Sequence, residues 1–140
     1  MSNAWYDEGL KQFALGNIAW KASGGSTIKA ILIDTAFYTY SAAHANLSDV
    51  AGGSRVGTAV ALTLIDAAAG GVLDANDVSV TGLSSPPTVE AIILYKDTGV
   101  EATSTLLAYI DTATSGLPTP AGVSQVDIAW NNGANKIGKL

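Results

Sequence analysis

The chain has 140 residues, of which 48% are hydrophobic and 14% are charged, and its formal net charge is −5. This length fits one domain, and the hydrophobic content excludes a disordered or fibrous chain. Acidic residues outnumber basic ones, so the chain has no strongly basic surface to bind a nucleic-acid backbone. No run approaches the roughly 18–20 apolar residues that span a bilayer. We therefore expect neither nucleic-acid binding nor membrane association.

The counts of cysteine and histidine restrict the chemistry further. There is no cysteine, which excludes disulfides, thiolate metal sites and cysteine nucleophiles. The single histidine, His44, rules out His-rich zinc sites and leaves one imidazole for any Ser-His-Asp mechanism. The N-terminal region carries Asp7 and Glu8 in place of a basic segment followed by an apolar one, so we expect no secretory signal.

The N-terminal region has a helical period. From Trp5 to Leu15 the apolar side chains recur at helical spacing, and Gly16 follows directly as a C-terminal cap. The pattern predicts one amphipathic helix and an N-terminal unit of residues 1–16 that packs on the rest of the chain. Residues 17–140 then form a single β domain.

The rest of the chain reads as short strands separated by Gly, Ser, Pro, Asn and Asp clusters. Residues 27–35 are apolar enough for a central strand, and residues 89–95 and 105–111 form a hairpin buried on both faces. Crossover helices are absent from the pattern. We predict an all-β fold, mainly an antiparallel β-sandwich or jelly roll of about eight strands, with one N-terminal α-helix. The predicted strands are residues 17–21, 27–35, 55–64, 72–73, 78–83, 89–95, 105–111 and 123–131.

Two clusters contain residue types used in catalysis or metal binding. Asp74, Asn76 and Asp77 resemble the start of a calcium loop, but the glycine and the distal glutamate of that loop are missing. An Asx turn explains them. His44 has serine and aspartate neighbours, Ser41, Ser48 and Asp49, but no G-x-S-x-G elbow accompanies it.

Carboxylate pairs give no stronger signal. Glu90 with Glu101, or Asp97 with Glu101, has the residue types of a glycosidase pair, but nothing in the spacing singles out either pair. We therefore predict no catalytic residues, no bound metal and no cofactor, and that the protein is not an enzyme.

The three tryptophans and five tyrosines offer a second type of function. Exposed aromatic side chains on one face form sugar platforms in carbohydrate-binding modules built on similar sandwiches. Most of the aromatic residues here sit inside apolar runs, which favours packing in a core. Tyr38 and Tyr40 are the best candidates for exposure.

Nine short segments are spread along nearly the whole chain, from Trp5 to Ile137. They are WYDEGLKQF (5–13), GNIAW (16–20), TIKAILID (27–34), LSDV (47–50), GSRV (53–56), GVLDANDV (71–78), EAIILYKDTG (90–99), LAYID (107–111) and WNNGANKI (130–137). They contain no catalytic residues, and together they resemble a family of small virion structural proteins of tailed bacteriophages.

The resemblance implies a structural protein of the phage particle. It would be a jelly-roll protein of the cement or decoration type, which holds neighbouring capsid subunits together. Its partners would be the major capsid protein or other virion proteins, together with further copies in a dimer or trimer. Its location would be the virion, assembled in the cytoplasm of the host bacterium. The alternatives are a tail or head-tail connector component, and a carbohydrate-binding or adhesin-like module. The candidate interface residues are Trp5, Phe13, Tyr38, Tyr40, Leu117, Pro118 and Pro120.

Overall fold

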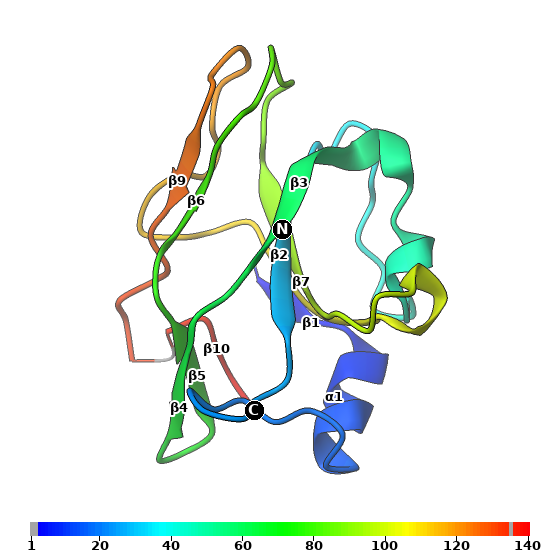
Figure 1. Ribbon diagram of the computed structural model, residues 1–140, viewed down its shortest axis with the longest axis vertical. Helices are drawn as coiled ribbons and strands as arrows, with labels where there is room; N and C mark the ends of the chain where they lie inside the picture. Colours follow the sequence, from blue (N-terminus) through cyan, green and yellow to red (C-terminus); the bar gives the residue numbers. More distant parts are fainter. Residues whose placement is uncertain (1–2, 135) are drawn as a thin grey trace.

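Five antiparallel strands form the central sheet of the computed structural model, which describes residues 3–134 and 136–140 (Figure 1). Every neighbouring pair in this sheet is antiparallel. The strand predicted to be central, β2, does lie inside the sheet, between β7 and β3. The spatial order is β1 (Ala4–Trp5), β8 (Thr105–Ile110), β7 (Ala91–Lys96), β2 (Ile28–Ile33) and β3 (Arg55–Ala61).

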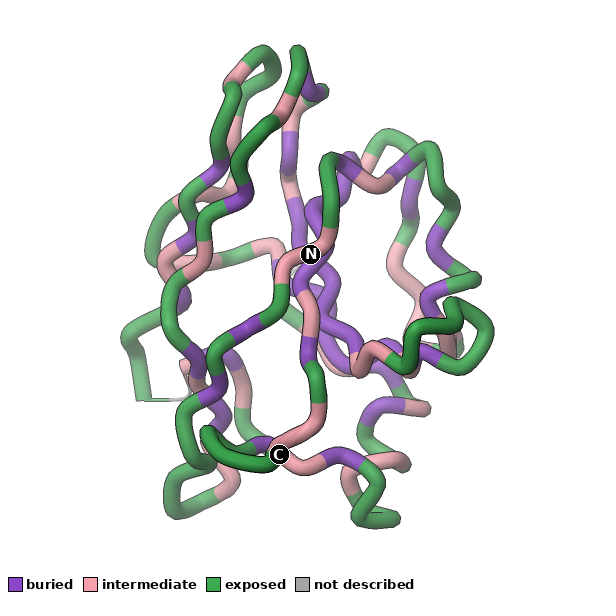
Figure 2. The backbone as a smooth tube through the Cα atoms, in the orientation of Figure 1, coloured by how far each residue is buried: buried purple, intermediate pink, exposed green. Residues whose placement is uncertain are grey.

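The central strands are buried on both faces, as the continuous apolar runs predicted. Residues 91–95 of β7 are at most 4% exposed, and Figure 2 shows the burial concentrated along β2 and β7. Alternate side chains enter two separate cores. The larger, here called the main core, contains Ile92 and Leu94, whereas the second core contains Ile93 and Tyr95.

Two small sheets cover the main-core face. One has the order β10 (Gly138–Lys139), β5 (Val72–Ala75) and β4 (Leu64–Ala68), and the other pairs β6 (Val78–Val80) with β9 (Val126–Ile128). Two buried indole side chains form hydrogen bonds to the backbone of β5 and of Asn76, the residue that follows it. The Nε1 of Trp20 donates to the carbonyl of Asp74 at 2.8 Å, and that of Trp130 to the carbonyl of Asn76 at 3.0 Å. The predicted all-β, sandwich-like fold with one helix near the N-terminus is confirmed.

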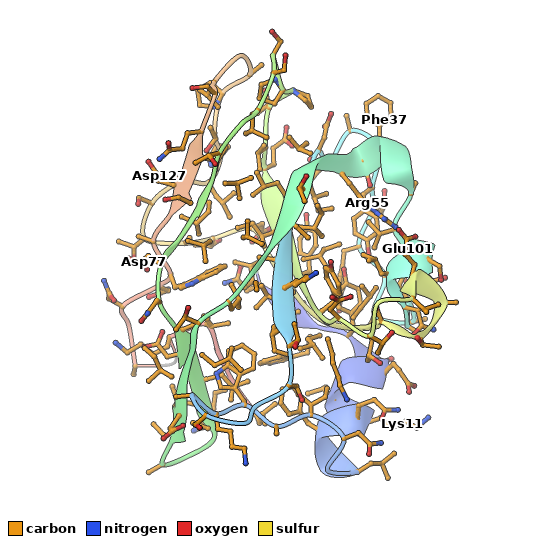
Figure 3. The ribbon with its side chains drawn as sticks, viewed as in Figure 1. Lys11, Phe37, Arg55, Asp77, Glu101 and Asp127 are labelled. Atoms are coloured by element: carbon orange, nitrogen blue, oxygen red, sulfur yellow. The ribbon has the colours of Figure 1, made fainter. Side chains whose placement is uncertain are left out.

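The second core is covered by the long connection from β2 to β3. This connection contains two short 3-10 helices, η1 (Leu47–Asp49) and η2 (Gly52–Ser54). Arg55 holds it in place, because its guanidinium donates to the carbonyls of Leu47 and Val50. The same group forms an ion pair at 2.6 Å with Glu101, in the 3-10 helix η3 (Glu101–Thr103), and the two side chains point toward each other in Figure 3.

The helix α1 (Asp7–Ala14) lies directly on β8. A Cβ added to Gly9 would come within 2.5 Å of the Leu106 carbonyl oxygen, so glycine is what permits this approach. The prediction that the helix begins at Trp5 was wrong. Trp5 is in β1, because the side chain of Asn3 accepts from the backbone N–H groups of Asp111 and Thr112 and fixes β1 beside β8.

Two further expectations differ from the structure. Residues 17–21 are not a strand, because the backbone N–H and carbonyl of Ala19 bond to Ser26 within the same loop. The interval between the predicted strands 55–64 and 72–73 was expected to be a break, but it contains most of β4, which pairs with β5. Ile65–Ala68 of β4 is exposed, so no apolar period reveals the strand.

Candidate partner-binding surface

The most distinctive surface of the molecule is an uncharged tip, made of residues 81–88 and 117–125. These two loops extend from the β6–β9 pair at the upper end in Figure 1. No charged residue occurs in 78–89 or in 112–126, and all four prolines of the chain lie in the tip. At its base, Asp77 precedes β6 and Asp127 lies in β9, and both are labelled in Figure 3. Such a surface carries no charge that a partner would have to desolvate.

Backbone hydrogen bonds join the two loops of the tip. Leu83 donates to the carbonyl of Ser124 at 3.0 Å, and Gly122 donates to that of Pro86 at 2.9 Å. Val89, just below the tip, and Thr119 exchange two bonds of 2.9 and 2.8 Å. Together with the fixed φ of proline, these bonds restrict both loops before any partner arrives.

Three apolar side chains attach the tip to the domain. Leu83, Leu117 and Val123 are half-buried and pack against the main core. Leu83 reaches β3 at Gly57, where an added Cβ would lie 2.5 Å from its Cδ2. Gly57 also has a φ of +70°, which disfavours any other residue. Of the predicted interface residues in this segment, Leu117 therefore points inward, while Pro118 and Pro120 are exposed.

An exposed aromatic residue, Phe37, lies toward the same end of the long axis as the tip (Figure 3). Its side chain is 67% exposed. Two hydrogen bonds hold the turn that carries Phe37. The carboxylate of Asp34 accepts from the N–H of Ala36 at 2.9 Å, and that of Glu90 accepts from the N–H of Thr35 at 3.0 Å. Aromatic residues, phenylalanine among them, are enriched at protein–protein interfaces. Phe37 is not among the interface residues predicted from the sequence.

Tyr38 and Tyr40, expected to be exposed, belong instead to a cluster with Tyr6 and Tyr109, here called the tyrosine cluster. Tyr38 is 6% exposed, and its hydroxyl lies 2.8 Å from that of Tyr6. Tyr40 is half-buried, and its hydroxyl donates to the carbonyl of Trp5 at 2.5 Å. Burial raises the pKa of both Tyr6 and Tyr38, so these hydroxyls stay neutral. The expectation of an exposed tyrosine surface was wrong.

Trp5 and Phe13 are half-buried against the main core and meet edge to face, with ring centroids 6.1 Å apart. Both were predicted as interface residues, but their rings pack mainly within the chain.

The residues considered for catalysis have structural partners. Nδ1 of His44 lies 2.9 Å from the Tyr38 hydroxyl, and Asp49 accepts from the N–H groups of Ala45 and Asn46. These two backbone bonds hold the pKa of the Asp49 carboxyl below its usual value. His44 and Asp49 are thus not arranged as the base and orienting acid of a triad.

The other carboxylates considered above are similarly engaged. Asp97 pairs with Lys29 at 2.8 Å, and Asp77 accepts from the N–H of Trp130 at 3.0 Å. Among residues 3–134 and 136–140, no group of three or more His, Cys, Asp or Glu side chains is placed to hold a metal ion. Within the same residues, no helix is long and apolar enough to span a membrane.

Comparisons with known proteins add no relative. No protein-family description, no curated protein and no solved structure matches this chain.

Proposed function

We propose that the chain is a non-enzymatic structural protein of a tailed-bacteriophage particle, and that it acts as a capsid cement protein. The resemblance of its sequence to small virion proteins suggests the setting. The observation that carries the proposal is the uncharged tip, which gathers all four prolines on two loops joined by backbone hydrogen bonds. Its partners are then the major capsid protein or other virion proteins.

The physical properties of the tip suit a cement protein. Such a protein stabilises a particle by burying surface across a joint between subunits, so that separating them also requires breaking its contacts. Binding is favoured when the buried surface has no unpaired charge and loses little conformational freedom. The tip meets both conditions, and Phe37 adds one large apolar side chain at the same end.

The first experiment is quantitative peptide mass spectrometry of sedimented particles, measured relative to the major capsid protein. A nearly stoichiometric ratio is the expected result. A few copies per particle would instead indicate a tail or connector component. Absence from clean particles would overturn the structural proposal.

The second experiment measures binding of the purified chain to assembled particles and to free capsid subunits. Ser84→Lys and Ser124→Lys each place a charge on the tip. Each should weaken particle binding about 100-fold if the tip is buried, because an unpaired buried ammonium is costly. Ala14→Lys is the matched control, since Ala14 is exposed on α1 at the opposite end. Equal binding by the tip and control variants would exclude the tip as the contact surface.

A carbohydrate-binding module has less support. Trp20 and Trp130 are 6% and 2% exposed, and both indole N–H groups bond within the chain. A change in the tryptophan fluorescence of the chain on addition of glycans from a panel would support this alternative.

A further inference from the structure

Two consecutive hydrogen bonds, here called the hydroxyl network, lead from the inside of the second core to the half-buried His44. The Tyr6 hydroxyl lies 2.8 Å from that of Tyr38, and the Tyr38 hydroxyl lies 2.9 Å from Nδ1 of His44. Tyr6 and Tyr38 are 0% and 6% exposed. Across residues 3–134 and 136–140, neither hydroxyl has another hydrogen-bond partner. The network must therefore satisfy both hydroxyl groups by itself.

The network joins two segments that are distant along the chain. Tyr6 directly precedes α1, whereas Tyr38 and His44 lie in the connection from β2 to β3. The backbone also joins these segments, because the N–H of Asp7 donates to the carbonyl of Ala42 at 3.0 Å. The hydroxyl network therefore helps to hold this connection against the start of the helix, over the second core.

The number of protons in the network decides whether every group is satisfied. Neutral His44 with its proton on Nε2 offers Nδ1 as an acceptor. The Tyr6 hydroxyl then donates to Tyr38, and the Tyr38 hydroxyl donates to Nδ1. In the cationic form Nδ1 also carries a proton, so three protons compete for two hydrogen bonds. One of the two hydroxyl groups is left without an acceptor, and an unsatisfied buried donor destabilises the fold.

One carboxylate favours the cationic form of His44. The charge of Asp49, in η1, acts on His44. Asp49 is exposed, so water screens this attraction. The hydroxyls of the tyrosine cluster stay neutral, because burial raises the pKa of each of them. The missing acceptor in the hydroxyl network is therefore the larger effect, and it favours neutral His44.

We infer that the hydroxyl network is a pH-sensitive latch on the connection from β2 to β3, which neutral His44 closes and protonated His44 opens. Histidine gains its proton between about pH 8 and about pH 5, so the latch is closed at the upper end of this range and open at the lower end. Asp49 stays charged throughout, because its pKa lies below 3.8. This device goes beyond the proposed function, since it acts within one chain and requires no particle.

The first measurement is the ¹⁵N spectrum of the imidazole ring in the unmodified chain at pH 8. His44 is the single histidine, so its ring signals need no further assignment. We expect an unprotonated Nδ1 and a protonated Nε2. A protonated Nδ1 at pH 8 would overturn the latch, because the network would then be unsatisfied without any change of pH.

Matched variants test the latch itself. The Asp7 amide reports on it, and its hydrogen-exchange protection, corrected for the intrinsic effect of pH, should fall at least about fivefold from pH 8 to pH 5. His44→Asn keeps an acceptor near the Nδ1 position but gains no proton, so its protection should change far less. Tyr38→Phe removes the hydroxyl beside Nδ1 and should also abolish the pH effect.

Two outcomes would overturn the latch. One is unchanged protection of the Asp7 amide in the unmodified chain, and the other is a fall of equal size in His44→Asn. Either result leaves the particle-binding test of the cement proposal unaffected.

Discussion

The tyrosine cluster and the uncharged tip each contain residues that the sequence suggested for binding, Tyr38 and Tyr40 in the first and Pro118 and Pro120 in the second. The fold turns the first region inward and leaves the second at the surface. The tyrosine cluster turns inward, since burial of its rings is favourable and the hydroxyls of Tyr6, Tyr38 and Tyr40 find partners within the chain. The tip stays outside, where small uncharged residues and prolines need no partner. The difference teaches that aromatic content is a poor guide to a binding surface when each polar atom can be satisfied internally.

The largest expected effect is in the second core, beneath the tyrosine cluster. Ile93→Ala removes a side chain that is 0% exposed, and it should lower the free energy of unfolding by about 2–5 kcal/mol. Val123→Ala in the tip removes half-buried atoms and should cost less than about 1 kcal/mol. Urea denaturation checks both values. Equal losses would contradict the division between a packed core and a peripheral tip.

A second prediction concerns the contact between α1 and β8. Gly9→Ala would improve helix propensity, but its Cβ would meet backbone atoms of Leu106 and Leu107 at 2.5 and 2.9 Å. We expect a net loss of about 1–3 kcal/mol in thermal or urea unfolding. Gly52→Ala is the matched control, since nothing lies within 4 Å of its added Cβ. A stabilised Gly9→Ala variant would mean that α1 does not rest on β8.

A third prediction tests whether the hydroxyl network stabilises the tyrosine cluster. Tyr38→Phe removes the hydroxyl that the buried Tyr6 hydroxyl contacts, and should destabilise the fold by about 1–2 kcal/mol. The double variant Tyr6→Phe and Tyr38→Phe leaves no unpaired hydroxyl and should recover part of that loss. A double variant less stable than Tyr38→Phe alone would refute this account.

A smaller effect is expected at Asp49, which caps the connection over the second core. Its folded pKa lies below the ordinary value of 3.8, so its stabilisation is present above that pH and is lost as the pH falls through the folded pKa. Asp49→Asn should therefore reduce the drop in unfolding free energy between about pH 6 and about pH 2.5. Chemical denaturation across this range measures it. An unchanged pH dependence would remove Asp49 from the explanation.

The smallest expected effect on stability is at Phe37. Because the ring is 67% exposed, Phe37→Ala should change the free energy of unfolding by less than about 0.5 kcal/mol. On assembled particles the same variant should bind at least about tenfold more weakly, as for an interface anchor. Thr39→Ala, at another exposed position of the same connection, is the control. Equal binding by the two variants would exclude Phe37 from the interface.

Local patterns in the sequence predicted much of the fold. The apolar run at 27–35 predicted a central strand, and the runs at 89–95 and 105–111 predicted a hairpin buried on both faces. The structure has β2, β7 and β8 at these places. In the strand predicted at 123–131, the alternation of residues places Val126, Ile128 and Trp130 on one face, and all three lie in the main core. These inferences succeeded because strand period and burial are read from neighbouring residues.

The candidate surface was predicted less well. Pro118 and Pro120 in one loop of the tip were candidate interface residues, but no residue of the second loop, which contains Pro86 and Pro87, was among the candidates. The absence of charge from 78–89 and 112–126 was a signal present in the sequence. Joining the two segments required the pairing of β6 with β9, which are distant along the chain. Phe37 offered no local signal, since nothing in its neighbours indicates that the ring faces solvent.

By itself, the sequence determined the class of fold, the doubly buried hairpin of β7 and β8, and the acidic, cysteine-free chemistry of the chain. These properties follow from composition and short-range period. Only the tertiary structure decided that Trp5 lies in an edge strand and that the tyrosines face inward. It also brought two uncharged loops together in one tip and placed Lys136 and Lys139 in the lining of a cavity beside β1. Each of these depends on contacts between distant residues, whose free energies of packing and hydrogen bonding outweigh local preference.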